Sequence, residues 1–192
     1  MVQKETTTFT IEEYLAIEKK AVVRHEYSNG QIATRNDGTL NHSQLTANMS
    51  ELLGILTENR DCGYYDSNLR VYLEKANSLV YTDGMLICGD PEISTEDEHA
   101  VINPSLVIEV LSEYTEYYDR GEKFRKYRTL NSFKEYLLID QYQPIVDVFC
   151  RASANVWEMR TVIGLDKSIP VDVLDCSIPL EDIYSKVEVR FR

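Results

Sequence analysis

The sequence predicts an α/β or α+β fold in which a mixed β-sheet is flanked by helices. Short segments rich in β-branched and aromatic residues alternate with a few longer segments whose apolar residues recur at helical spacing. Hydrophobic residues make up 43% and charged residues 27%, which excludes wholesale disorder, collagen and coiled coil. The length of 192 residues fits one domain spanning residues 1–192.

Three segments are predicted to be helical. Thr10 and Glu13 form a capping-box pattern before the first, residues 11–20. Residues 41–57 place four leucines and a methionine on one face, which is typical of an amphipathic helix. The third segment, residues 116–128, lies between two predicted strands.

Eight further segments are predicted to be extended. The first segment, residues 25–35, is divided by turn residues at 28–30. Residues 145–151 and 156–162 are expected to form an antiparallel pair, which is an additional antiparallel β region. The segments are residues 25–35, 64–73, 79–88, 106–111, 136–140, the pair 145–151 and 156–162, and a sheet edge at 169–173.

Charge and cysteine content restrict the function and the compartment. The 20 Lys and Arg against 32 Asp and Glu give a net charge of −12, which argues against a basic DNA-coating protein. No apolar run approaches the ~20 residues that span a bilayer, so we expect no membrane partner. Because the four cysteines form no CxxC pair and the polar start lacks a signal-peptide pattern, we expect four free thiols and a cytoplasmic location.

Two carboxylates lie inside apolar segments. Glu109 interrupts the run Leu106 to Leu111, which otherwise resembles a strand buried on both faces, and Asp83 interrupts residues 79–87 in the same way. If the two strands are neighbours, a hard cation such as Mg²⁺ or Mn²⁺ would relieve the repulsion between the carboxylates. Alternatively, Asp83 caps a turn before Gly84 and Glu109 bonds a buried Arg or Lys.

Lys123 is a third candidate. Asp119, Lys123 and Tyr127 recur at i, i+4 and i+8 on the helix that follows the Glu109 strand, so the Lys123 ammonium could orient an attacking water. The alternative is an exposed Asp119–Lys123 ion pair worth only about 0.3–0.5 kcal/mol. The same segment carries Arg120, Arg125, Lys126 and Arg128, which form either a phosphate-facing patch or a solvated helix face.

A long ordered string of residues begins with Asn103-Pro104-Ser105 followed by residues 106–112, and it continues through residues 115, 119–123, 127–128 and 135–140. This string resembles the Uma-two group of endonucleases, within the restriction-endonuclease-like proteins that have a PD-(D/E)XK core. The resemblance covers roughly residues 8–151 and implies a restriction-endonuclease-like mixed β-sheet flanked by helices.

This resemblance implies metal-dependent hydrolysis of DNA phosphodiester bonds. Asp83 would be the motif aspartate, Glu109 the motif glutamate and Lys123 the motif lysine displaced onto the next helix. The resemblance places Mg²⁺, or Mn²⁺ in its place, between Asp83 and Glu109, with the backbone carbonyl of Val110 as the third protein ligand.

The resemblance also implies supporting roles for Glu26 and His42, to which we add Tyr127 as a candidate phosphate contact. Glu26 would complete or orient the metal shell, and His42 and Tyr127 would contact phosphate. Alternatively, Glu26 is an exposed acid before a turn and His42 bonds backbone or water at the start of a helix. Thr82 replaces the proline of the family motif, which predicts a looser backbone at Asp83 and Gly84.

A second hypothesis keeps the fold and omits catalysis: a nuclease-like module that serves as a binding or regulatory partner. The thirteen tyrosines are more than one core needs, which favours a homodimer, because aromatic residues are enriched at interfaces. Alternatively, their rings edge the core with their hydroxyls in water.

Overall fold

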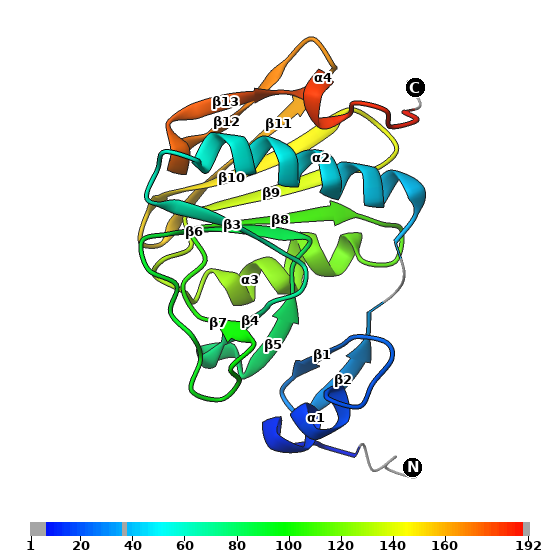
Figure 1. The fold of residues 1–192 in the computed structure, drawn as a ribbon, viewed down its shortest axis with the longest axis vertical. Helices are drawn as coiled ribbons and strands as arrows, with labels where there is room; N and C mark the ends of the chain where they lie inside the picture. Colours follow the sequence, from blue (N-terminus) through cyan, green and yellow to red (C-terminus); the bar gives the residue numbers. More distant parts are fainter. Residues whose placement is uncertain (1–6, 36–37, 190–192) are drawn as a thin grey trace.

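The computed structural model describes residues 7–35 and 38–189 (Figure 1). The helices are α1 Ile11–Glu18, α2 Leu40–Thr57, α3 Phe124–Tyr127 and α4 Leu180–Ile183, with 3-10 turns η1 Glu74–Ala76 and η3 Asp172–Leu174 and a π-helical segment η2 Tyr118–Lys123. The strands are β1 His25–Ser28, β2 Gln31–Thr34, β3 Cys62–Asp66, β4 Arg70–Leu73, β5 Ser78–Tyr81, β6 Gly84–Cys88, β7 Ala100–Val101, β8 Leu106–Leu111, β9 Glu135–Asp140, β10 Ile145–Ser153, β11 Val156–Ile163, β12 Ser168–Val171 and β13 Cys176–Pro179. Within the described ranges, no helix has both the length and the apolar character needed to cross a bilayer.

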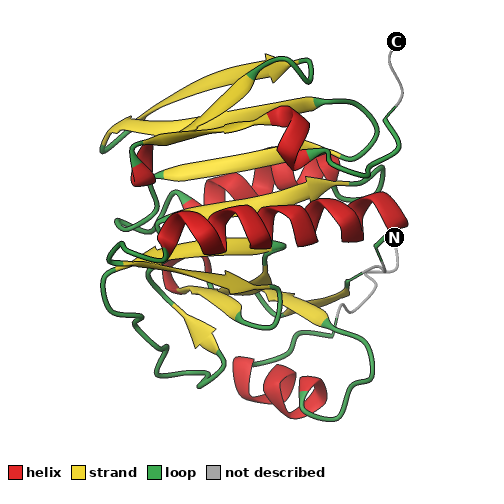
Figure 2. Cartoon of the chain, turned by 45° about the horizontal axis from the view of Figure 1, so that its top comes forward, coloured by secondary structure: helices red, strands yellow, loops and turns green. Residues whose placement is uncertain are grey.

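The main sheet has six strands in the order β11-β10-β9-β8-β6-β3. The β8–β9 pair is parallel, whereas the other pairs are antiparallel, so the predicted mixed sheet is confirmed. Figures 1 and 2 show α2 on one side of this sheet and the helical segment ending in α3 on the other. The strand that carries Glu109, β8, therefore lies in the middle of three layers.

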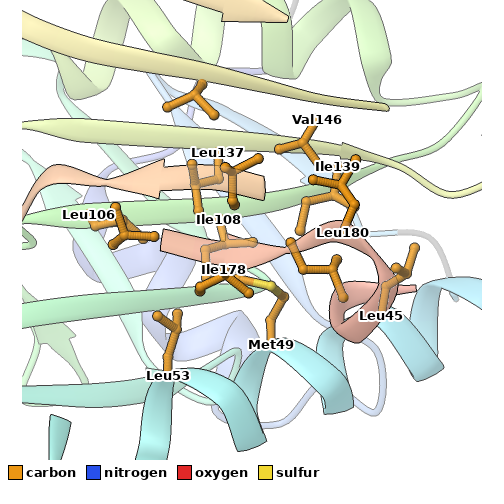
Figure 3. Packing of buried hydrophobic residues seen from close by; sticks show 14 of the residues in the cluster. Leu45, Met49, Leu53, Leu106, Ile108, Leu137, Ile139, Val146, Ile178 and Leu180 are labelled. Atoms are coloured by element: carbon orange, nitrogen blue, oxygen red, sulfur yellow. The ribbon is translucent and has the colours of Figure 1, made fainter. Parts of the chain in front are cut away.

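Alternation along β8 sends its side chains into two cores. Leu106, Ile108 and Val110 face α2, where they pack with Leu45 and Met49 (Figure 3). Each such fully buried aliphatic side chain stabilises the fold by roughly 1.5–3 kcal/mol. The helix predicted over residues 41–57 is thus confirmed, and its apolar face covers the sheet.

The other face of β8 meets an aromatic cluster. Val107 and Leu111 pack there with Tyr127, Phe133 and Tyr136. Because side chains alternate along a strand, Glu109 lies on this same face, toward the helical segment that follows β8. The alternation alone directs a carboxylate at that segment.

The chain crosses between two sheets where single strands were expected. The second sheet has the order β2-β1-β5-β4-β7, so residues 64–73 divide into β3 and β4, and residues 79–88 divide into β5 and β6. The first break is a turn in which the Asp66 carboxylate accepts the Asn68 N–H at 2.9 Å. The second break falls at Thr82 and Asp83, which join the two sheets.

The predicted β10–β11 pair is confirmed, but the sheet edge at residues 169–173 is wrong. β12 pairs with β13 as a separate two-stranded sheet, and Ile169 and Ile178 pack with α4 into the core beneath α2. An apolar strand can be buried by packing on a sheet face as well as by joining its edge, and the periodicity is the same in both cases.

The expectation of four free thiols is also wrong. Cys62 and Cys88 are paired across β3 and β6 and form a disulfide, whereas Cys150 and Cys176 are free. The two residues are 26 positions apart, so only the strand register brings them together.

A carboxylate at the start of β9 holds the β12–β13 region. The buried Glu135 accepts the N–H groups of Asp172 and Val173 at 2.8 and 2.9 Å. Burial raises the pKa of Glu135 despite these bonds. Glu135 is therefore a structural clamp rather than an exposed acid.

We predict that Glu135→Ala destabilises the protein by about 1–3 kcal/mol, because two backbone N–H groups lose their acceptor. Glu135→Gln should cost less, since it keeps one acceptor oxygen. Urea unfolding measures both, with the exposed Glu181→Ala as the control. An Ala variant as stable as wild type would contradict the clamp.

Candidate functional site

A cavity of about 380 Å³ lies where the β1–β2 hairpin, the start of α2, the end of β8 and the segment 112–126 meet. Six of the predicted site residues line it: Glu26, His42, Asp83, Glu109, Val110 and Lys123. The seventh, Tyr127, is fully buried behind them. The fold therefore brings residues from widely separated parts of the chain to one cavity.

Asp83 is fixed at the junction between β5 and β6. Its N–H donates to the Ile108 carbonyl at 3.1 Å, and its Oδ2 accepts the Val110 N–H at 2.7 Å. β6, which begins directly after Asp83, is the neighbour of β8, which carries Glu109, so the condition for bringing the two acids together is met. Asp83 does not cap a local turn, since its side chain bonds a strand 27 residues away.

Gly84 is closely packed: a Cβ atom there would lie 2.5 Å from the Tyr64 hydroxyl, so a larger residue would have to displace that side chain. Thr82 leaves its hydroxyl buried without a hydrogen-bond partner among the described residues.

Two cationic or hydrogen-bonding side chains meet the Asp83 carboxylate. Arg35 donates to Oδ1, and His42 Nε2 lies 3.1 Å from Oδ2. Burial raises the pKa of Asp83, but His42, Arg35 and the Val110 N–H outweigh it and hold the pKa below its usual value. Asp83 is therefore ionised.

Glu109 is 2% exposed and contacts Lys123, which agrees with the alternative that Glu109 bonds a buried Arg or Lys. Its Oε1 lies 2.8 Å from Lys123 Nζ and accepts from the Tyr127 hydroxyl at 3.3 Å. Its Oε2 has no hydrogen-bond partner in the part of the chain that the structure describes. One oxygen is anchored and the other is left for a further ligand.

Lys123 is buried, with 4% of its surface exposed, so the exposed ion pair is wrong. Its Nζ lies 3.6 Å from both Asp119 Oδ1 and Glu26 Oε1, besides Glu109. Burial lowers the pKa of Lys123, but Glu109 and Glu26 raise it well above the usual value, so the amine is protonated. The π-helical segment η2 ends at Lys123 and sets its position over β8.

Burial raises the pKa of Glu109 well above its usual value, and the charge of Lys123 opposes this. Asp119 and Asp83 add to the increase by repulsion. Glu109 therefore competes for a proton or another cation despite its lysine partner.

Glu26 and His42 also differ from the simpler alternatives. Glu26 is mostly buried, and its Oε1 accepts the Tyr81 N–H at 3.0 Å. The His42 side chain faces Asp83, while its backbone N–H donates to Thr39 Oγ1 at 3.1 Å. Both side chains belong to the site.

Sequence reasoning missed Arg35. It follows β2, and its guanidinium lies against Asp83. Burial lowers the pKa of Arg35, but Asp83, and then Glu109 and Glu26, raise it above its usual value. No motif or periodicity distinguishes it. Only the pairing of β1 with β2 and β5 brings it to the cavity.

As a group, the basic residues around Lys123 form neither a phosphate-facing patch nor a solvated helix face. Arg120 pairs with Glu116 and Asp147, and the buried Lys126 pairs with Glu122. Arg125 and Arg128 are exposed. The segment is therefore largely neutralised by its own neighbours.

The oxygen donors of the cavity are of the type that a hard divalent cation takes, but among the described residues no three of its side-chain donor atoms lie within 4.8 Å of one another, so side chains must move to hold one ion. Asp83, Glu109, Glu26 and Asp119 supply four carboxylates against the two cations Arg35 and Lys123, and the oxygen donors suit Mg²⁺ or Mn²⁺. Arg35 occupies Asp83 Oδ1, so a cation shared between Asp83 and Glu109 requires the guanidinium to withdraw.

A different ligand cluster lies at the other end of β9. Within residues 7–35 and 38–189, the close group of three candidate ligand atoms is Glu135, Cys150 and Asp172. The Glu135 oxygens already accept backbone N–H groups, so this cluster has a structural explanation.

Comparisons with known proteins agree with the geometry. The model of the Uma2 family, described as "Putative restriction endonuclease", matches residues 11–181. A crystal structure of a "putative nuclease belonging to DUF820" from Anabaena variabilis superposes with a TM-score of 0.73 at 17% identity, covering 92% of this chain and 98% of that one. The latter likeness supports the fold.

Two Synechocystis proteins are similar in sequence. Uncharacterized protein sll1609 is 33% identical over 88% of this chain and 96% of its own length. Uncharacterized protein slr1290 is 32% identical over 90% of each chain. The similarity therefore extends over nearly the whole chain.

We predict that Arg35→Gln strengthens Mn²⁺ binding at the cavity by about tenfold or more, because it removes a positive charge that competes for Asp83. Isothermal titration calorimetry measures the effect. Arg24→Gln, which changes the same charge at a side chain bonded to Ser67 and Asn68, is the control. Unchanged or weaker binding in Arg35→Gln would show that the guanidinium does not compete.

Proposed function

The chain belongs to the Uma2 family, and from this premise we propose that it is a Mg²⁺-dependent endonuclease that hydrolyses DNA phosphodiester bonds. The observation that carries the proposal is the convergence of the Asp83 and Glu109 carboxylates and the Lys123 ammonium on one cavity. Mn²⁺ would serve in place of Mg²⁺, since both take oxygen ligands.

The carboxylates would hold the cation. Asp83 and Glu109 would be the side-chain ligands, with the Val110 carbonyl as a third, and the cation would lower the pKa of a bound water and stabilise charge on the phosphate. His42 and the Val110 N–H keep Asp83 Oδ2 in place. Glu26 supports the arrangement through Lys123.

Lys123 would orient the attacking water. The protonated amine is fixed by Glu109 at 2.8 Å, and its remaining hydrogens can point into the cavity that it lines. In this role it is a hydrogen-bond donor to the water or the phosphate. Tyr127 is a positioning residue that holds Glu109 Oε1 from the buried side.

Arg35 and His42 are the phosphate-binding candidates at the cavity wall. A guanidinium released from Asp83 is well suited to bind phosphate oxygens in a bidentate manner. This assigns to Arg35 the contact expected of Tyr127, whose hydroxyl is buried.

We predict that wild-type protein cleaves plasmid DNA in Mg²⁺ or Mn²⁺, and that Asp83→Asn, Glu109→Gln and Lys123→Met each lower the rate by about 10²-fold or more. Loss of general acid–base or electrostatic groups has effects of this size. Agarose gels of nicked and linear plasmid measure the rates.

Glu158→Gln on β11 is the control, because its side chain is exposed and does not line the cavity. Circular dichroism confirms that each variant folds. Wild type that cuts no faster than folded Asp83→Asn would defeat the proposed activity.

A second candidate is a non-catalytic nuclease-like module that binds or regulates a partner. The contact of Arg35 with Asp83 favours it, since a permanently placed guanidinium would substitute for the metal. Metal titration separates the two candidates. If the protein is an enzyme, we expect it to bind Mg²⁺ or Mn²⁺ with a millimolar or lower Kd, and Glu109→Gln to abolish this binding. If it is a non-catalytic module, we expect no such binding.

The homodimer and the cytoplasmic location also remain proposals. Most tyrosines are at least partly buried, so only a few rings are available for an interface, among them Tyr114 and Tyr117. Light scattering after gel filtration tests the dimer, and a monomeric mass at micromolar concentration would contradict it.

A further inference from the structure

Two exposed tyrosines, Tyr114 and Tyr142, line the cavity, and a third, Tyr117, lies in sequence between the lining residues Thr115 and Tyr118. We call Tyr114, Tyr117 and Tyr142 the tyrosine rim. Tyr114 and Tyr142 line the cavity from two different loops, one before η2 and one between β9 and β10. Tyr117 follows Tyr114 at the start of the helical segment. Their exposed fractions are 82% for Tyr114, 94% for Tyr117 and 37% for Tyr142.

These rings contribute little to the fold. Other tyrosines, such as Tyr14, Tyr127 and Tyr136, are fully buried and pack with neighbouring rings. Tyr114 and Tyr117 leave most of their surface in water, so the fold gains little from burying them. Their ring faces are free to stack on a ligand.

The charges around the rim disfavour binding through phosphate alone. The cavity wall holds six carboxylates against the three cations Arg35, Lys123 and Lys126, which leaves a formal charge of −3 with His42 neutral. The whole chain carries −12. Because a duplex has a higher density of phosphate charge than a single strand, this negative surface disfavours a duplex more than a single strand.

Unlike the phosphates, the bases of DNA can bind to exposed aromatic rings. An unpaired base presents an uncharged aromatic face, and stacking on an exposed aromatic ring contributes about 1–3 kcal/mol for each base. In a duplex the base faces are already stacked on one another, so rings at a cavity mouth cannot reach them without unpairing.

We propose that the tyrosine rim binds unpaired bases, so that the preferred substrate is single-stranded DNA or an unpaired segment of a duplex. This inference rests on the proposed nuclease function and names its substrate class. The bases stack at the rim, and the backbone between them descends to Asp83, Glu109 and Lys123.

The test uses fluorescence anisotropy with the full chain in Ca²⁺, which replaces Mg²⁺ so that binding is measured without cleavage. The probes are a short labelled single strand and a duplex of the same sequence. We expect tighter binding of the single strand by wild type, and a loss of about 5- to 150-fold in Tyr114→Ala and Tyr117→Ala, which corresponds to 1–3 kcal/mol per base.

Two controls separate ring stacking from other effects. Tyr114→Phe and Tyr117→Phe keep the ring and should bind like wild type. Met159→Ala removes an exposed apolar side chain on β11, outside the cavity, and should also bind like wild type. Light scattering of the alanine variants shows whether the rim is instead a contact between two copies of the chain.

Equal or tighter binding of the duplex, or an unchanged single-strand affinity in both alanine variants, would overturn the inference. So would a change of mass from dimer to monomer in those variants together with unaltered DNA binding. Plasmid cleavage that depends on Asp83 would still support the nuclease in each of these cases, so the two proposals fail separately.

Discussion

The contact between Lys123 and Glu109 is the interaction on which the rest of the site depends. β8 is buried on both faces, so a carboxylate at its fourth position needs a charged partner, and the lysine needs the carboxylate equally. Their 2.8 Å contact fixes the helical segment against the sheet, and that segment carries Asp119 and Tyr127 to the same place. Removing either partner would leave an uncompensated charge in the interior.

The same site has more negative than positive charge, and Arg35 is the internal group that reduces the excess. It bonds the oxygen of Asp83 that a divalent cation would need. The Arg35 guanidinium and a divalent metal ion are alternative partners of the Asp83 carboxylate. If the metal ion binds, the site is that of a nuclease, and if Arg35 stays in place, the site is that of a non-catalytic module. The unpartnered Oε2 of Glu109, among the residues described, marks the other side of this position.

Much of β8, with Glu109 on it and Lys123 on the segment that follows, could be predicted because the signals are local. An acid within an apolar run and a lysine on the following helix are visible in a short stretch of sequence, and the string around them is specific to the family. Arg35, the disulfide between Cys62 and Cys88, and the separate β12–β13 sheet all depend on which strands pair. The break at Thr82 and Asp83 escaped detection for the same reason, since apolar residues continue on both sides while the chain changes sheets.

A crystal soaked in Mn²⁺, with anomalous scattering used to locate the ion, tests the central claim most directly. The account predicts an anomalous peak bonded to both Asp83 and Glu109, with the Arg35 guanidinium withdrawn from Asp83. A saturating soak that leaves Arg35 on Asp83 and places no ion there, or places the ion instead at Glu135, Cys150 and Asp172, would contradict it.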